Sequence, residues 1–284
     1  MMILVTGATG NIGSELVPLL LTKGAAVRVI SRDPGKAARL DSRVERAIGD
    51  LHEPSVIEQA LNGVDRVFMV SILFDKNHEA DRLLIDSAKR AGVRHIVKIS
   101  SGNVSVGEKG GIGGLHREKE QFVEGSGIPW TFLRPGGFMS NALQWVETIK
   151  KQSQVFNPTG NGRFSPIAPH DIAAVAAVAL TSDGHEGKIY DLTGRELLSV
   201  PDQVRILSEV IGKPIRCVDI PIAAAMERMK ANGLPESLAE SLANVWTRIL
   251  EGRGTFQTDE VGKVTGKPAR KFESWCRQHR EAFV

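Results

Sequence analysis

The stretch MMILVTGATGNIGSELVPLL (residues 1–20) decides the fold. The apolar run from Met2 to Thr6 predicts a buried strand, and the apolar residues after the glycines recur at helical spacing. Between them lie Gly7, Gly10 and Gly13 in the pattern G-x-x-G-x-x-G. Glycine lets the backbone approach a pyrophosphate closely, and the N–H groups at a helix start point at it. A strand, a glycine-rich turn and a helix in this order therefore predict a dinucleotide-binding site.

Each glycine of this turn has a predicted task. Gly7 suits the tight turn, Gly10 the close approach of the phosphate, and Gly13 the packing of the helix on the strand. A glycine triplet alone is a weak signal, but here it stands between a strand and a helix. The alternative is a tight strand–helix turn that holds no ligand.

The alternation of apolar strands with helices continues to about residue 150. Each strand returns after a helix, which requires a parallel sheet with right-handed crossovers, and solid apolar strands require cover on both faces. We therefore predict the α/β class, with a Rossmann-type doubly wound parallel sheet. Further strands are expected at residues 26–30, 44–48, 66–70, 95–99 and 129–133. Helices are expected at residues 34–40, 54–61, 78–90, 116–124 and 138–150.

The stretch from Ser100 to Gly114 interrupts this alternation. It holds six glycines and little that could pack in a core. A long glycine-rich loop at the carboxyl end of a central strand is typical of the rim of a site. A charged helix is expected to begin only at His116.

The texture of the sequence changes after Lys151, where turn signals become frequent. Asp171 is expected in the first turn of an Ala/Val-rich helix. We predict a dinucleotide-binding domain over residues 1–152, to which segments near 165–193 return. Residues 153–284 are predicted to form a smaller, mostly helical domain that closes over the cofactor edge of the sheet. Its later elements are helices near 201–211, 222–232 and 235–251 and a short strand at 215–218, and one more strand is expected at 187–192.

Composition and charge exclude several classes of protein. The net charge of +3 is too small to indicate nucleic-acid binding. The longest apolar run, residues 172–180, is too short to span a bilayer. Two cysteines, Cys217 and Cys276, cannot staple a chain this long, and no signal peptide is expected, so we predict a cytoplasmic location. The histidines show no metal-ligand spacing, and no metal is expected.

The nucleotide is predicted from the end of the second strand, which meets the adenosine ribose. Ser31 and Arg32 lie at this tip, and Lys36 follows one helical turn later. Arginine offers a planar fork of donors to a 2′-phosphate, which favours NADP(H) over NAD(H). Asp33 complicates this preference, but it precedes Pro34 and is suited to cap a helix instead. If Arg32 and Lys36 form only a solvated face, NAD(H) stays open.

The chain carries the segments TGATGNIG, ISRDPGK, AIGDLHEP, AGVRHIVKISS, SGIPWTFLRPGGFMSN, PHDIAAVAA and GKIYDLTG. Together these segments resemble the atypical short-chain dehydrogenase/reductases of the NmrA-like group. The likeness covers nearly the whole chain and is greatest to the bacterial NAD(P)H:quinone oxidoreductase and triphenylmethane reductase branch. VTGKPARKFESWCRQHREAF (residues 264–283) resembles the usual C-terminal helix of that group.

The resemblance implies a Rossmann architecture with a lid and an NADP(H) site. It places cofactor contacts on Gly7, Thr9, Gly10, Asn11, Ile12, Gly13, Ser31, Arg32 and Lys36. It also implies that Asp50 and Leu51 flank the adenine, that Val70 and Ser71 line the ribose, and that Pro135, Gly136 and Phe138 lie near the nicotinamide.

The catalytic pattern departs from that of the wider superfamily, which uses Tyr-x-x-x-Lys. The one tyrosine of this chain is Tyr190, and no lysine follows four residues later. Counted back from Ser126-Gly127, the tyrosine and lysine positions of the family fall at Ile112 and His116. Isoleucine cannot donate a proton, which puts alcohol–ketone chemistry by the usual route in doubt.

Hydride transfer itself needs only a nicotinamide held against an acceptor in a water-poor pocket. A quinone becomes aromatic on reduction and needs little acid help. Ser100 or Ser101 could hydrogen-bond its oxygen, and Ser100 could equally be a cofactor contact or a turn residue. His116 could donate a proton, could bind the nicotinamide ribose, or could belong only to the charged helix. Candidates for an apolar acceptor wall, unless they pack in a core, are Phe74, Phe138, Met139 and Trp145.

Two hypotheses follow for the function. The first is an NADPH-dependent reductase of quinones or similar conjugated acceptors, with a small molecule as its partner. The second is a regulatory protein that senses NADP(H) redox state and signals through a partner protein, which the missing tyrosine favours. A homodimer is left open in both cases.

Overall fold

The computed structural model describes residues 1–72, 75–253 and 256–284. The described residues form two compact units, which we call the sheet unit and the helical unit. The sheet unit holds Met1–Pro135 and Pro169–Asp191, and the helical unit holds Gly136–Ala168 and Leu192–Val284. The lid role predicted for residues 153–284 and the domain boundary at residue 152 stay predictions.

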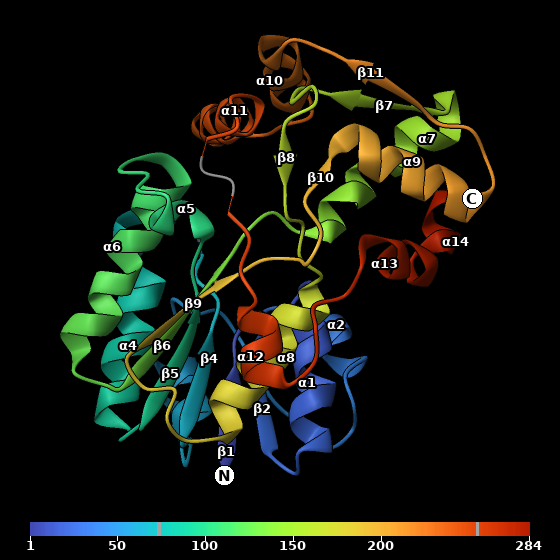
Figure 1. Cartoon of the computed structure of the whole chain (residues 1–284). Coiled ribbons are helices and arrows are strands. Elements are labelled where there is room, and N and C mark those ends of the chain that lie inside the picture. Colours follow the sequence, from blue (N-terminus) through green and yellow to red (C-terminus); the bar gives the residue numbers. More distant parts are fainter. Residues whose placement is uncertain (73–74, 254–255) are drawn as a thin grey trace. The chain divides into compact units, whose positions relative to one another are not determined.

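The sheet unit is built on a seven-stranded sheet with the order β3-β2-β1-β4-β5-β6-β9 (Figure 1). Val5 of β1 is paired with Val29 on one side and with Phe68 on the other, and the neighbouring pairs from β3 to β6 all run parallel. The predicted Rossmann-type α/β fold is therefore confirmed. The strands are β1 (Met2–Val5), β2 (Ala26–Ser31), β3 (Glu45–Ile48), β4 (Arg66–Met69), β5 (His95–Ile99), β6 (Trp130–Pro135) and β9 (Lys188–Leu192).

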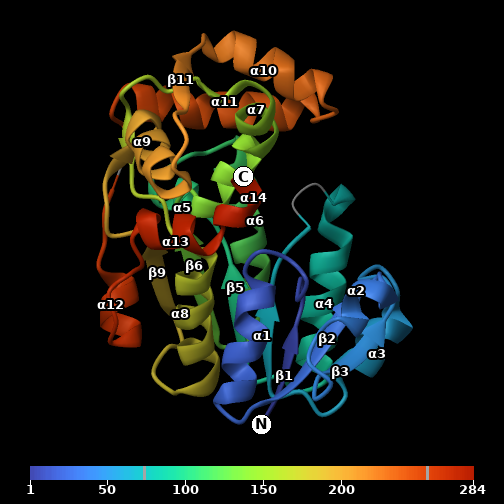
Figure 2. The same cartoon turned by 90° about the vertical axis from the view of Figure 1, so that its right-hand side faces the viewer.

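Helices cover both faces of this sheet, as the nearly solid apolar strands require. Figure 2 shows α1 (Gly13–Thr22) beside α8 (Pro169–Thr181), and α8 also packs on β4, β5 and β6. The opposite face carries α3 (Pro54–Leu61), α4 (Glu79–Arg90) and α6 (Gly111–Ser126), which pack in that order side by side. The short elements are α2 (Pro34–Ala38), η1 (Lys76–His78) and α5 (Gly102–Ser105).

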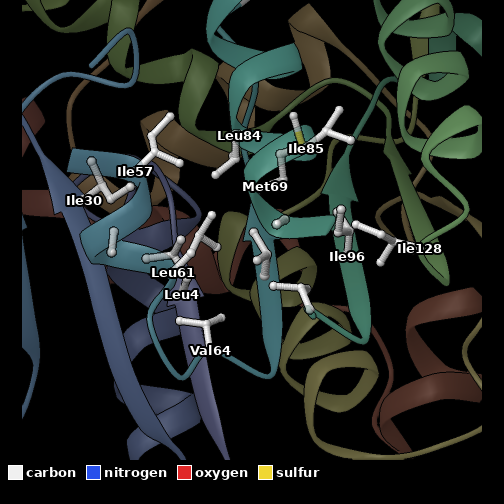
Figure 3. Packing of buried hydrophobic residues seen from close by; sticks show 14 of the residues in the cluster. Leu4, Ile30, Ile57, Leu61, Val64, Met69, Leu84, Ile85, Ile96 and Ile128 are labelled. Carbon is white, nitrogen blue, oxygen red and sulfur yellow. The ribbon is translucent and has the colours of Figure 1, made fainter. Parts of the chain in front are cut away.

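The apolar core of the sheet unit lies between the strands and the α3, α4 and α6 face. Figure 3 shows Leu4 of β1 beside Leu61 of α3, and Leu84 of α4 and Ile96 of β5 belong to the same apolar cluster. All four are at most 2% exposed. Burying one such side chain stabilises the fold by about 1.5–3 kcal/mol, so this layer holds the strand order in place.

The turn after β1 depends on close contact between two glycines. Gly7 has φ +65°, a left-handed conformation, and its carbonyl accepts a hydrogen bond of 3.0 Å from the Gly10 N–H. A Cβ on Gly13 would lie 2.2 Å from that same Gly7 carbonyl oxygen, which no real side chain can do. Gly13 is therefore where α1 packs directly on the backbone that leaves β1, as predicted for this position.

The prediction of one loop from Ser100 to Gly114 is wrong. Gly102–Ser105 forms α5, and α6 begins at Gly111 rather than at His116. Glycine is unfavourable in helices, but here it allows close packing: the Gly113 N–H donates 3.1 Å to Glu108 Oε2, and a Cβ on Gly113 would lie 2.6 Å from the Cβ of Glu108. This close local contact offsets the low helix propensity of the glycines.

Two predictions after the glycine-rich region also need correction. Strand β6 continues to Pro135 instead of ending at Leu133. The helix predicted over residues 138–150 is a 3₁₀ segment, η2 (Met139–Trp145), followed by α7 (Val146–Gln152).

The helical unit has its own core, around Leu207, Phe272, Trp275 and Phe283. The single C-terminal helix implied by the resemblance is instead three short helices, and Gly266, at φ +72°, ends the first of them.

Sequence patterns did not predict β7, β8 and β10, because strands of two to four residues carry little periodicity. Two small sheets form, with β11 parallel to β7 and β10 antiparallel to β8. The remaining elements are β7 (Gln154–Asn157), β8 (Arg163–Phe164), α9 (Val200–Ile211), β10 (Leu198–Ser199), β11 (Arg216–Asp219), α10 (Ile222–Ala231), α11 (Glu236–Leu250), α12 (Glu260–Thr265), α13 (Phe272–Gln278) and α14 (Arg280–Phe283).

Replacing Gly13 with alanine is expected to destabilise the fold by about 1–3 kcal/mol, because the methyl group must push α1 away from the Gly7 carbonyl. Urea unfolding followed by circular dichroism measures this change. Gly125→Ala is the matched control, since a Cβ there meets nothing within 4 Å and alanine favours the helix. Equal stability of the Gly13→Ala variant and the unaltered protein would refute the packing argument.

Candidate functional site

The carboxyl ends of the parallel strands bring several predicted residues to one edge of the sheet unit. The Thr6 hydroxyl accepts a 2.7 Å hydrogen bond from the Val70 N–H, which ties the end of β1 to the end of β4. A Cβ on Gly7 would lie 3.3 Å from the Val70 side chain, so these two loops are in contact. Thr9, Gly10 and Asn11 are exposed, while Ile12 and Gly13 are buried. The exposed backbone stands at the start of a ten-residue helix, which is the geometry that binds phosphate.

Ser71 provides an independent sign of a ligand at this edge. Its Oγ is buried, and no residue in the described ranges is its hydrogen-bond partner. A buried hydroxyl without a partner costs about 1–3 kcal/mol, so a polar group from outside the chain would stabilise it. The predicted role of Val70 and Ser71 beside a ribose fits this observation.

The tip of β2 presents two exposed cations. The side chain of Arg32 is 74% exposed and that of Lys36 is 65% exposed. Asp33 caps α2 by accepting the Lys36 N–H at 3.0 Å, and this bond lowers the pKa of the Asp33 carboxyl. The capping role predicted for Asp33 is confirmed, and the second carboxylate oxygen of Asp33 lies 3.9 Å from Lys36 Nζ. The Ser31 Oγ donates to the Asp33 carbonyl oxygen at 3.0 Å and shapes the same turn.

The loop after β3 holds Asp50 and Leu51. Leu51 is half-buried and packs on the core of the sheet unit. Asp50 Oδ1 lies 2.6 Å from the imidazole Nδ1 of His52 and accepts the His52 backbone N–H at 2.9 Å. These two bonds hold the pKa of Asp50 below its usual range. Asp50 Oδ2 also lies 3.7 Å from the Arg32 guanidinium, which joins the loops after β2 and β3.

Ser100 directly follows β5 and is part of a buried ionic network. Its hydroxyl donates to Glu120 Oε1 at 2.6 Å, and Arg134 donates to both oxygens of the same carboxylate at 2.8 and 2.7 Å. Burial raises the pKa of Glu120, but the bonds from Arg134 and Ser100 more than offset it, so the net pKa is lowered. The Ser100 hydrogen is therefore committed to Glu120. Ser101 Oγ accepts from the Asn103 N–H at 3.2 Å, and its own hydrogen can point elsewhere.

Sequence reasoning missed Glu120 and Arg134, which stand 14 residues apart. Glu120 belongs to a helix segment rich in charge and Arg134 to the end of a strand. Arg134 lies in the segment SGIPWTFLRPGGFMSN, but the resemblance assigns a role to neither residue. Their pairing follows from the sheet placing α6 beside β6, which only the folded structure shows.

His116 lies on α6, one turn before Glu120. Burial lowers the pKa of His116 to about 3, and the nearby Lys98 cation acts in the same direction. Its Nδ1 is buried and has no partner among the residues that the structure describes. Lys98 is itself fully buried, which lowers its pKa to about 8. His116 is thus a neutral imidazole at pH 7, which favours a hydrogen-bonding role over that of an imidazolium acid.

The residues predicted beside the nicotinamide are divided between the two units. Pro135 ends β6 in the sheet unit, while the Gly136 N–H donates to the Leu192 carbonyl at 2.9 Å and Phe138 is paired with Ile167 in the helical unit. Their place near a nicotinamide stays a prediction.

Two of the four residues suggested as an acceptor wall belong to a core. Met139 is buried in the core of the helical unit, and Trp145 packs against it. Phe74 lies outside the described residues. The hydroxyl of Tyr190, the single tyrosine of the chain, lies 2.8 Å from His185 Nδ1. This phenol is therefore engaged at β9, the edge strand of the sheet.

Over residues 1–72, 75–253 and 256–284, no three His, Cys, Asp or Glu side chains gather as a metal site. In the same ranges, no helix has both the length and the apolar character needed to cross a membrane.

The fold and the turn after β1 define the class: an α/β protein of the Rossmann type with a dinucleotide-binding turn. The chain belongs to the NmrA-like family, whose model matches residues 1–277. The chain is 40% identical over 283 residues to the NAD(P)H azoreductase of Xenophilus azovorans, with 99% of each chain covered.

Two solved structures with the same fold as this chain are complexes with a nicotinamide dinucleotide. The NADPH complex of quinone oxidoreductase QOR2 from Escherichia coli is 27% identical, with a TM-score of 0.86 over 98% of this chain and 99% of that one. The NADP(H) complex of triphenylmethane reductase from Citrobacter is 25% identical, with a TM-score of 0.83 over 98% and 99%. These homologues are NAD(P)H-dependent reductases.

The imidazole of His116 is expected to stay neutral down to about pH 4, because its folded pKa of about 3 lies far below the ordinary value of 6.5. NMR of the histidine ring, assigned with a His116→Gln variant, measures the titration. The unfolded chain binds this proton below about pH 6.5, so the fold loses up to about 2 kcal/mol between pH 7 and pH 5 through this group. That part of the acid sensitivity should vanish in His116→Gln. A titration near pH 6.5 would contradict the assignment.

Proposed function

We propose that this protein is an NADP(H)-dependent oxidoreductase that transfers a hydride to a quinone-like or other conjugated small-molecule acceptor, without a Tyr-Lys pair. The observation that carries the proposal is the contact of Gly13 with the Gly7 carbonyl, which places an exposed backbone at the start of α1. The unpartnered Ser71 hydroxyl at the same edge supports it. The relatives named as azoreductase and quinone oxidoreductase support the reaction type.

The residues present fit a phosphorylated dinucleotide. The turn from Gly7 to Gly13 would hold its diphosphate, and Arg32 with Lys36 would pair with a 2′-phosphate. One oxygen of Asp33 caps α2, and the other lies 3.9 Å from the Lys36 ammonium. When bound, NADPH supplies the hydride. NAD(H) remains the weaker alternative, since both cations would then lack a partner on the ligand.

The polar groups near the end of β5 favour acceptors that need little proton transfer. Ser100 donates its hydrogen to Glu120, and His116 is neutral at pH 7. Ser101 and the neutral His116 ring can each donate a hydrogen bond to a carbonyl oxygen that gains charge. Such a site can stabilise the anionic product of hydride transfer, which later takes its proton from water.

A regulatory protein that senses NADP(H) redox state is the second candidate. The isoleucine at position 112, half-buried in the first turn of α6, provides no proton donor at the position of the family tyrosine. Such a protein would bind the dinucleotide and signal through a partner protein. Cys217 and Cys276 are free thiols, as expected of the cytoplasmic location that we propose for either candidate.

Turnover separates the two candidates. Mixed with the protein and a panel of quinones, azo dyes and triphenylmethane dyes, NADPH is expected to lose its reduced-nicotinamide absorbance in stopped-flow measurements, faster than without protein. Simple ketones should remain unreduced, because their alkoxide products need a strong proton donor. Tight NADPH binding with no turnover of any acceptor would favour the sensor.

The Arg32→Ala variant is expected to bind NADPH about tenfold or more weakly, while its affinity for NADH stays nearly unchanged. The reason is that a charged hydrogen bond to the 2′-phosphate is lost, which only NADPH can make. Fluorescence titration of both reduced cofactors measures the two dissociation constants. Arg94→Ala is the control, since Arg94 forms an exposed ion pair with Asp65 at the amino end of β5. Equal losses for NADPH and NADH would count against the guanidinium as the selector.

A further inference from the structure

His52 lies between two carboxylates that come from different loops. Its Nδ1 is 2.6 Å from Asp50 Oδ1, after β3, and its Nε2 is 2.8 Å from Asp75 Oδ1, before α4. An ionised carboxylate only accepts hydrogen bonds, and a neutral imidazole carries a single N–H. Both short contacts can therefore be hydrogen bonds together only when His52 is an imidazolium.

The two carboxylates differ in their solvent exposure and in their other contacts. Asp75 is 6% exposed and also accepts the Ala80 N–H at 2.8 Å, so it is fixed to the start of α4. Asp50 is 30% exposed and is the carboxylate that lies 3.7 Å from Arg32. His52 thus connects a buried anchor to the carboxylate that faces the guanidinium of Arg32.

The charged groups around His52 favour its protonated form. The bond to Asp75, and then that to Asp50, raise the pKa of His52 above its ordinary value. Arg32 reaches Asp50 from the tip of β2, and Glu53 Oε1 accepts the Asp50 N–H at 3.1 Å. The Lys119 cation of α6 helps to lower the pKa of Asp75.

We propose that His52 determines the preference of this protein for NADPH over NADH, by neutralising Asp50 so that Arg32 stays available to the 2′-phosphate. This inference rests on the proposed function, because it needs the dinucleotide to bind at Arg32. Without the imidazolium charge, Asp50 holds Arg32 more strongly and repels a phosphate placed beside it. NADH has no 2′-phosphate, so its affinity should change little.

The preference for NADPH over NADH should decrease as the pH rises. Below its raised pKa, His52 is charged and the preference for NADPH is complete. As the pH rises through that pKa, the charge and one of the two bonds are lost, and the ratio of the NADH to the NADPH dissociation constant falls. The 2′-phosphate has its own second pKa near 6, so the ratio is best followed from about pH 7 to pH 9.

The experiment measures both dissociation constants by calorimetry for the full chain and three variants. His52→Gln is expected to lower the ratio about threefold to tenfold at pH 7, because a single charge is removed near the phosphate at a partly exposed site. His52→Lys keeps a permanent cation and is expected to retain the preference, with a flat profile to pH 9. His170→Gln is the matched control, since His170 also pairs with a carboxylate, Glu15, at 2.9 Å but belongs to α8.

The outcomes separate this inference from the proposed function. If NADPH binds tightly and His52→Gln leaves the ratio unchanged, the role of His52 is refuted while the proposed function stands. If the unaltered protein binds neither dinucleotide, both fall. NMR titration of the His52 ring provides a test that needs no variant: an ordinary pKa in the free protein would overturn the double carboxylate contact on which the inference rests.

Discussion

The structure of the sheet unit depends on one steric constraint, the contact between Gly13 and the carbonyl oxygen of Gly7. A single methyl group at position 13 would lie 2.2 Å from that oxygen. The start of α1 is therefore pressed against the chain that leaves β1, and Gly7 turns through a left-handed conformation to allow it. The Thr6 hydroxyl then fixes this turn to Val70 of the neighbouring loop. Backbone contact, rather than any reactive side chain, thus shapes the candidate phosphate site.

A second feature, the burial of charge on α6, sets the electrostatics at the end of β5. Lys119 is fully buried and pairs with Asp81 of α4 at 2.5 Å, while Glu120 pairs with Arg134 of β6. Buried pairs such as these contribute little net stability, but removing one partner leaves an uncompensated charge, so each pair fixes the position of α6. The helix begins with glycines and would be weak alone. Its ionic contacts hold the middle of the helix against α4 and β6.

Much of the fold could be predicted from local signals. Pro54 and the Asn62-Gly63 turn bracket α3, and β5 was bounded by Gly92 and the two serines, so both elements were predicted to the residue. The glycine-rich stretch was misread because glycine is a weak helix former, and the bond between Gly113 and Glu108, five residues apart, matches no helical spacing. The short strands of the helical unit pair over long separations, such as β7 with β11, and leave no periodic trace. The capping role of Asp33 was predictable from Pro34 alone.

The candidate site also has parts that local sequence predicts and parts that it does not. The glycine turn and the cations after β2 follow from motifs. In contrast, Arg134 beside Glu120 and Asp75 beside His52 come from other segments, which only the fold brings close. Cofactor contacts at individual residues remain predictions in either case. Local sequence therefore predicts the class of ligand for the glycine turn. The protonation states of Glu120 and His52 depend on residues that only the fold brings near them.

The protonation states at the end of β5 also rank the acceptors that the proposed function allows. A hydride added to a ketone leaves an alkoxide, which needs a proton at once, and neither Ser100 nor a neutral His116 is suited to supply it. A quinone leaves an aromatic phenolate that is stable until water protonates it. A cationic triphenylmethane dye takes the hydride on its central carbon and becomes neutral without any proton. The missing tyrosine is therefore compatible with reduction, provided that the acceptor stabilises its own product.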